Sequence, residues 1–126
     1  MKIQRFGTTR RYSDSVVHGN TLYLVEVPGN LEADITEQTA NLLASVDTLL
    51  AQAGSVRHKL LMVTVYLADM ADFPAVNEVY GRYFQGDFPA RATVQVAALP
   101  RGAQVEIDAV AFKMPFPMGP PGPMAA

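Results

Sequence analysis

Apolar and polar residues alternate along the first quarter of the chain in a pattern typical of β-strands. The segments Asp14–His18 and Thr21–Val27 contain many β-branched, aromatic and leucine residues, and the turn-forming pair Gly19-Asn20 separates them, which predicts a β-hairpin. A shorter, mixed segment at Gln4–Thr8 predicts one strand before the hairpin. Pro28-Gly29-Asn30 ends the second hairpin strand, because these residue types favour turns.

The apolar residues then recur at every third or fourth position, which is the spacing of an α-helix. An amphipathic helix is therefore predicted from about Ile35 to Ala53. Asp34 is the expected N-cap, and Glu37 stands where the acid of a capping box belongs. Gly54 follows at the position where glycine commonly ends a helix.

A further strand, a second helix and two final strands are predicted in the second half. Lys59–Ala68 is apolar on both faces, which is typical of a central strand covered on both sides. Asp72 is the expected cap of a helix that has Pro74 in its first turn and ends at Gly86. Two strands and the turn between them complete the pattern: Arg91–Leu99, Pro100–Ala103 and Gln104–Lys113.

The order β-β-β-α-β-α-β-β predicts an α+β fold in which both helices cover one face of a mixed sheet. No third layer is left for the other, apolar face, so we infer self-association. Residues 1–113 are expected to form the domain. Residues 114–126 are rich in proline and glycine, which predicts a flexible end; a docking segment or an arm packed on a neighbouring subunit is the alternative.

Composition argues against several classes of function. Apolar residues make up 49% of the 126 residues, the net charge is −2 and the pI is about 5.6, so no basic surface favours nucleic acid. Cysteine is absent, which excludes disulfides and thiolate chemistry. His18 and His58 have no ligand partners at metal spacing. With no signal-peptide pattern and no membrane-length apolar run, a cytoplasmic protein is expected.

Arg91 is the most informative candidate for chemistry. It follows Pro89-Ala90 at the start of a strand, and its planar guanidinium suits a carboxylate. Glu106 and Asp108 lie two residues apart on the neighbouring strand and therefore share a face. Taken alone, Arg91 is more often a surface residue, and the two acids are equally well a solvated stripe.

Two long segments, together with the order of elements, resemble the RidA (YjgF) family of reactive-intermediate deaminases. One begins with Phe88-Pro89-Ala90-Arg91 and continues through Val105–Ala111; the other runs from Val65 to Tyr80. The resemblance covers about Tyr12 to Phe112. It implies a chorismate-mutase-like fold and a homotrimer with a central barrel, whose ligand clefts lie between subunits. It also implies hydrolysis of enamines and imines to 2-keto acids and ammonia, without cofactor or metal.

The resemblance also implies roles for individual residues. Arg91 matches the arginine that binds the substrate carboxylate, and Glu106 matches the acid that positions a water molecule. Tyr12 matches an aromatic residue that lines the cleft. Thr93 stands where the family often has cysteine.

The sequence departs from the deaminating members at the end of its third strand. Those members usually carry a Ser-Gly-Gln-type run, whereas Val25 and Glu26 stand here. Strand alternation predicts that at most one of the two lines the site. The overall pattern, including Leu67-Ala68-Asp69-Met70-Ala71-Asp72-Phe73, is closer to the less-characterised branches of the family. It leaves open a non-catalytic binder or sensor of small carboxylates, or a chaperone-like interaction protein; an endoribonuclease fits the acidic pI least.

Overall fold

The computed structural model describes residues 2–113, which form one six-stranded sheet and two α-helices. Their order confirms the predicted one. The elements are β1 (Ile3–Phe6), β2 (Ser15–His18), β3 (Thr21–Glu26), α1 (Ile35–Gln52), β4 (Leu60–Leu67), α2 (Phe73–Phe84), β5 (Ala90–Gln95) and β6 (Val105–Phe112), with short 3-10 turns η1 (Arg57–Lys59), η2 (Met70–Asp72) and η3 (Pro100–Gly102).

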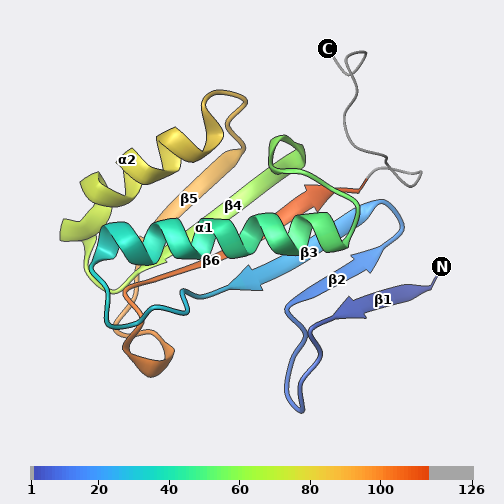
Figure 1. Ribbon diagram of the computed structural model, residues 1–126, viewed down its shortest axis with the longest axis horizontal. Coiled ribbons are helices and arrows are strands. Elements are labelled where there is room, and N and C mark those ends of the chain that lie inside the picture. The colour runs from blue at the N-terminus through green and yellow to red at the C-terminus, as the bar shows by residue number, and fades with distance from the viewer. Residues whose placement is uncertain (1, 114–126) are drawn as a thin grey trace.

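The strands lie side by side in the order β1-β2-β3-β6-β4-β5. Only β4 and β5 are parallel, and α2 connects them by the helical crossover that a parallel pair requires. Both helices lie on the same face of the sheet (Figure 1). The predicted α+β fold, a mixed sheet with two helices on one face, is therefore confirmed.

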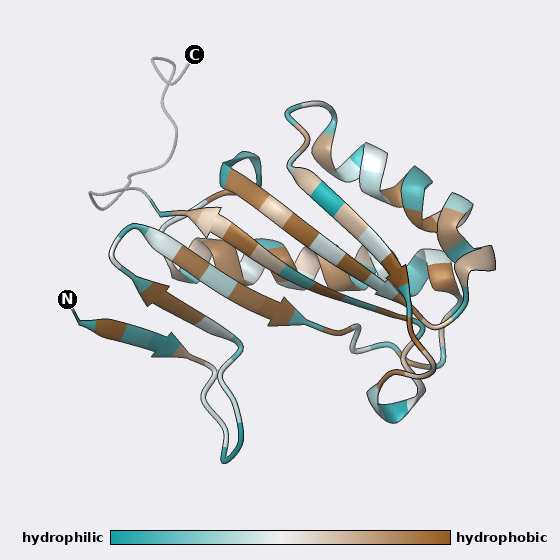
Figure 2. Cartoon of the chain, turned by 180° about the vertical axis from the view of Figure 1, so that it is seen from behind, coloured by the Kyte–Doolittle hydropathy of each residue, from teal (hydrophilic) through white to brown (hydrophobic). Residues whose placement is uncertain are grey.

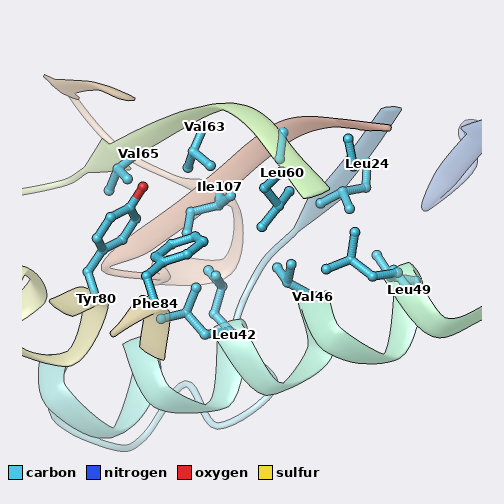
Figure 3. Packing of buried hydrophobic residues seen from close by; sticks show 14 of the residues in the cluster. Leu24, Leu42, Val46, Leu49, Leu60, Val63, Val65, Tyr80, Phe84 and Ile107 are labelled. Carbon is cyan, nitrogen blue, oxygen red and sulfur yellow. The ribbon is translucent and has the colours of Figure 1, made fainter. Parts of the chain in front are cut away.

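The core lies between the helices and the sheet (Figure 3). The apolar stripe of α1, which includes Leu42 and Val46, packs toward Leu24 of β3 and Ile107 of β6, and all four side chains are buried. Tyr80 and Phe84 close the core beneath α2. Because residues on a strand alternate between faces, this packing decides which strand residues remain on the open face.

The helix caps are predicted correctly for α1 but not for α2. The Asp34 carboxylate accepts a hydrogen bond from the Glu37 N–H at 2.9 Å, as expected for an N-cap. The predicted cap by Asp72 is wrong, because its side chain makes no capping bond. The turn η2 runs directly into α2 and gives Asp72 near-helical backbone angles. Asp69 caps that turn instead, accepting from the Ala71 N–H at 2.9 Å.

Two strand boundaries also differ from the predictions. The expected strand Arg91–Leu99 ends at Gln95, because its partner β4 ends at Leu67. A single further bond, from the Val96 N–H to the Leu67 carbonyl, closes the pair. The first strand occupies Ile3–Phe6 rather than Gln4–Thr8.

The sheet face opposite the helices has no cover within residues 2–113. The predicted cover on both faces of β4 is therefore absent from the single chain, where Leu61 is 56% and Met62 38% exposed. Figure 2, seen from this side, shows apolar bands along the central strands. Neither helix is long and apolar enough to cross a membrane. The predicted flexible end, residues 114–126, lies outside the described residues, so the domain boundary at residue 113 stays a prediction.

Replacing Leu42 with alanine tests the core. Its side chain is fully buried, so Leu42→Ala is expected to lower the free energy of unfolding by about 2–5 kcal/mol, from lost burial and the cavity left behind. Urea denaturation followed by circular dichroism measures the change. The exposed Thr36 on the same helix is the control, and equal effects of Leu42→Ala and Thr36→Ala would contradict the packing described.

Candidate functional site

A pocket of about 520 Å³ lies where β3 ends and β6 begins. Three segments form its walls: the loop before β2, the segment that follows β3, and the turn η3. The lining residues are Tyr12, Ser13, Asp14, Val25, Glu26, Val27, Pro28, Leu31, Pro100, Arg101, Ala103 and Glu106. Three sequence-predicted site residues, Tyr12, Glu106 and Glu26, therefore meet in one place.

The loop that carries Tyr12 is held by its own hydrogen bonds. The Thr9 hydroxyl oxygen accepts from the Arg11 N–H at 3.1 Å and from the Tyr12 N–H at 3.2 Å. The Thr9 N–H donates to the Tyr12 carbonyl at 2.7 Å. Tyr12 as a whole is 59% exposed. The loop therefore presents this residue at the pocket mouth with most of its surface free.

Gly7 permits this loop to return toward the sheet. Its φ is +63°, and a Cβ atom placed there would lie 2.1 Å from Asp14 Oδ2. The Asp14 N–H also donates to the Phe6 carbonyl at 3.0 Å, and the Asp14 carbonyl accepts from the Val25 N–H at 3.0 Å. Only glycine leaves room for the Asp14 carboxylate, which consequently stands on the pocket wall beside the end of β3.

Gln38 of α1 joins two other walls of the pocket. Its amide nitrogen donates to the carbonyls of Leu31 at 3.2 Å and Ala33 at 3.0 Å. Its amide oxygen accepts from the Gln104 N–H at 3.0 Å. The side chain is fully buried, and all its bonds go to backbone. Gln38 therefore fixes the segment after β3 against the segment before β6.

Two acids in the pocket have raised pKa values. Burial raises the pKa of Glu106 above its usual value, and the nearby Asp108 adds to the effect. Burial also raises the pKa of Glu26; the hydrogen bond from the Val27 N–H, at 3.1 Å, opposes this, and the charge of Asp14 reinforces it. Both carboxylates are thus better proton acceptors than ordinary glutamates.

Strand alternation led us to expect that at most one of Val25 and Glu26 lines the site. The two side chains do alternate, since Val25 stands in register with Asp108 on the open face and Glu26 with the buried Ile107. Both nevertheless line the pocket. The reason is that the pocket lies at the end of β3, where it is reached from both faces of the sheet.

Arg91 and Thr93 do not line this pocket. They stand on the edge strand β5, in register with the buried Val63 and Val65, and so face the helices. The Arg91 guanidinium lies 4.6 Å from the centre of the Tyr80 ring and 5.4 Å from that of Phe73. Within residues 2–113 it forms no ion pair. The single chain therefore separates the predicted carboxylate anchor from the predicted water-positioning acid.

Arg101 lines the pocket, although the sequence indicated only a turn there. It is the one basic residue among the lining residues. Its φ is +57°, a left-handed conformation that non-glycine residues seldom adopt. Such strain is frequent at ligand sites. The available signal was an arginine between Pro100 and Gly102, in a turn where glycine or asparagine is usual.

The remaining candidates lie apart from the pocket. Asp108 shares the open face with Glu106, as predicted, and its Oδ2 accepts from the Tyr66 hydroxyl at 2.6 Å. His18 and His58 are both exposed. No group of three or more histidine, aspartate or glutamate side chains suited to a metal ion occurs within residues 2–113.

Comparison with known proteins places this architecture in a family. Residues 2–113 match the family model described as Endoribonuclease L-PSP. The RutC family protein YoaB of Escherichia coli K12 is 44% identical over 112 residues, which span 88% of this chain and 98% of that protein. The 2-iminobutanoate/2-iminopropanoate deaminase of Capra hircus is 40% identical over 115 residues, spanning 83% of this chain and 82% of that protein.

A solved structure agrees with these relatives. The YjgF-family protein from Neisseria meningitidis superposes with a TM-score of 0.84 at 37% identity, over 90% of this chain and 97% of that one. The chain belongs to the L-PSP family, which is also called RidA or YjgF. The resemblance inferred from the sequence is therefore confirmed.

Replacing Gln38 with leucine tests its role at the pocket. The change removes three hydrogen bonds and leaves part-buried backbone groups unpaired, so Gln38→Leu is expected to cost about 3 kcal/mol of stability. Denaturation gives the stability, and amide hydrogen exchange is expected to show faster exchange at Gln104. Gln52→Leu, at an exposed position on α1, is the control. An unchanged exchange rate at Gln104 would refute the link between the two walls.

Proposed function

We propose that this protein hydrolyses small, reactive 2-imino acids and their enamine forms to 2-keto acids and ammonia. The observation that carries the proposal is the pocket that brings Tyr12 and Glu106 together. It occurs in a chain 40% identical to a protein named as a 2-iminobutanoate/2-iminopropanoate deaminase. A cytoplasmic location suits this chemistry, because enzymes that use pyridoxal phosphate release such imines there.

The proposed site is a cleft completed by a second copy of the chain. Arg91 and Thr93 stand on β5, away from the pocket, so a neighbouring subunit is needed to bring Arg91 to it. The open sheet face supports assembly, because exposed apolar side chains there need cover; they include Tyr23, Val25, Met62 and Val94. We propose a homotrimer, in which three sheets face a common centre and three equivalent clefts form.

The chemistry requires little beyond positioning. The partner's Arg91 binds the substrate carboxylate through two parallel hydrogen bonds. Glu106 orients a water molecule toward the imine carbon and accepts one of its protons as the C–O bond forms. The C=N electrons move to the protonated imine nitrogen, which becomes an amine, and Glu106 returns the proton to it. The C–N bond then breaks and ammonia leaves, while the new hydroxyl gives its proton to Glu106 and becomes the carbonyl of the keto acid. The raised pKa of Glu106 favours the first proton transfer.

A non-catalytic binder of small carboxylates is the second candidate. The change to Val25 and Glu26 at the pocket favours it, since these replace the small polar run of deaminating relatives. Binding of 2-oxobutyrate without any turnover of imines would identify this function. RNA cleavage is favoured less, because three of the pocket residues are acidic and one is basic.

Mixing two inactive variants tests the intersubunit cleft. Arg91→Ala and Glu106→Gln are each expected to lower kcat/KM by about 100-fold, through lost carboxylate binding and lost water activation respectively. In randomly mixed oligomers about one quarter of the clefts regain both groups if these come from different chains. Release of 2-keto acid from a freshly generated imine is the measurement.

Arg82→Ala is the matched control for the arginine, since Arg82 is exposed on α2 and pairs with Glu78. It is expected to retain wild-type activity. If the mixture remains as inactive as either variant alone, the two groups do not come from different subunits. If Arg91→Ala alone is fully active, the anchor is assigned wrongly.

The pH dependence tests Glu106 as the proton acceptor. Only its ionised form accepts a proton, so activity falls as the pH drops through its pKa. Because burial raises that pKa above its ordinary value, the acid limb of kcat/KM lies at higher pH than for an ordinary glutamate. Asp108→Asn removes a charge that raises this pKa and is expected to move the limb to lower pH. The measured rates are corrected for spontaneous hydrolysis of the imine. An acid limb of kcat/KM that Asp108→Asn leaves at the same pH would argue against Glu106 as the proton acceptor.

A further inference from the structure

Within the described part of the chain, Glu26 is a half-buried carboxylate without a cationic partner. One carboxylate oxygen accepts the Val27 N–H at 3.1 Å, and no ion pair involves Glu26 within residues 2–113. A carboxylate withdrawn from water is destabilised in its charged form unless a cation compensates it. The pKa of Glu26 is raised for that reason, by burial first and by Asp14 in addition. A positive charge beside Glu26 would relieve both effects.

The side chains around the pocket also carry more negative than positive charge. Asp14, Glu26 and Glu106 contribute three carboxylates, whereas Arg101 contributes one guanidinium that forms no ion pair with any of them. A cavity lined mostly by one sign of charge attracts ligands of the opposite sign. The pocket of this chain therefore disfavours a ligand whose side chain is anionic and favours one whose side chain is cationic.

Arg101 lines the same pocket but forms no ion pair with Glu26, so the missing cation has two other possible sources besides a metal ion. The described residues offer no group of three metal-ligating side chains, so a metal ion does not suit the position. The partner's Arg91 is one organic candidate. However, its guanidinium is already stacked against Tyr80 and Phe73, and in the proposed function it binds the substrate carboxylate. The side chain of the ligand itself is the other source.

We propose that Glu26 is a specificity-determining residue that makes this site prefer imines whose side chain carries a cation, such as a guanidinium. The proposal rests on the proposed function and names the substrate class for that site. The ligand lies with its carboxylate toward the partner's Arg91 and its cationic end toward Glu26, with Asp14 adding long-range attraction. Val25, beside Glu26, offers apolar surface for the methylene groups between the two ends.

Two substrates with side chains of equal length but different charge test whether the site recognises a cation. The imines formed by an amino-acid oxidase from arginine and from citrulline differ in that one ends in a charged guanidinium and the other in a neutral urea. Wild-type protein is expected to show a higher kcat/KM for the arginine imine. Glu26→Gln keeps an oxygen acceptor for the Val27 N–H but removes the charge. The arginine-to-citrulline ratio of kcat/KM is expected to fall about tenfold, the value of one charge-assisted hydrogen bond.

Glu32→Gln is the matched control, because Glu32 is exposed and outside the pocket; its ratio is expected to equal that of the wild type. Three results overturn the assignment. The first is an arginine-to-citrulline ratio in Glu26→Gln equal to that of the wild type, and the second is a wild-type preference for the citrulline imine. The third is faster hydrolysis of both imines by Glu26→Gln, which would mean that Glu26 pairs with Arg91. If the wild type hydrolyses neither imine but does hydrolyse 2-iminobutanoate, the assignment of Glu26 alone is refuted. If it hydrolyses none of the three, the proposed function is refuted as well.

Discussion

The packing of two helices on a single face of the sheet governs the rest of this structure. The stripe of α1 that includes Leu42 and Val46 buries one side of β3, β6 and β4. Strand residues alternate, so every side chain not used there is directed to the uncovered face. That face carries both apolar side chains and the acids Glu106 and Asp108. The same packing therefore leaves apolar side chains that need to be buried by a partner and places the two acids beside them.

Much of the fold was predictable because local and tertiary preferences agree. The helix from Ile35 follows from its apolar period and from Asp34, whose cap the structure contains. Prediction failed where a neighbouring element determined where a strand ends or how a helix begins. The strand at β5 is shorter than its own residues suggest, because β4 offers no partner beyond Leu67. Asp72 lost its capping role to a 3-10 turn that the sequence did not reveal.

The site was predictable to a smaller extent. Tyr12 and Glu106 were identified through the family resemblance and do meet in one pocket. Arg101 was missed, because its place in the pocket depends on a left-handed turn and on the approach of the loop before β2. The paired contribution of Val25 and Glu26 was missed as well. Alternation describes the middle of a strand, whereas this pocket lies at an end, where the backbone leaves the sheet.

The place of β6 in the sheet has a consequence for how the protein is made. This strand is the last of the six in the sequence, yet it lies between β3 and β4. A ribosome that has not yet released Val105–Phe112 holds a chain whose strands can form only two separate pieces, β1-β2-β3 and β4-β5, and each piece has an edge of unpaired backbone N–H and C=O groups where β6 belongs. The two pieces can therefore be joined by strand pairing only after β6 has been synthesised. Premature termination before β6 would leave aggregation-prone fragments rather than a smaller domain.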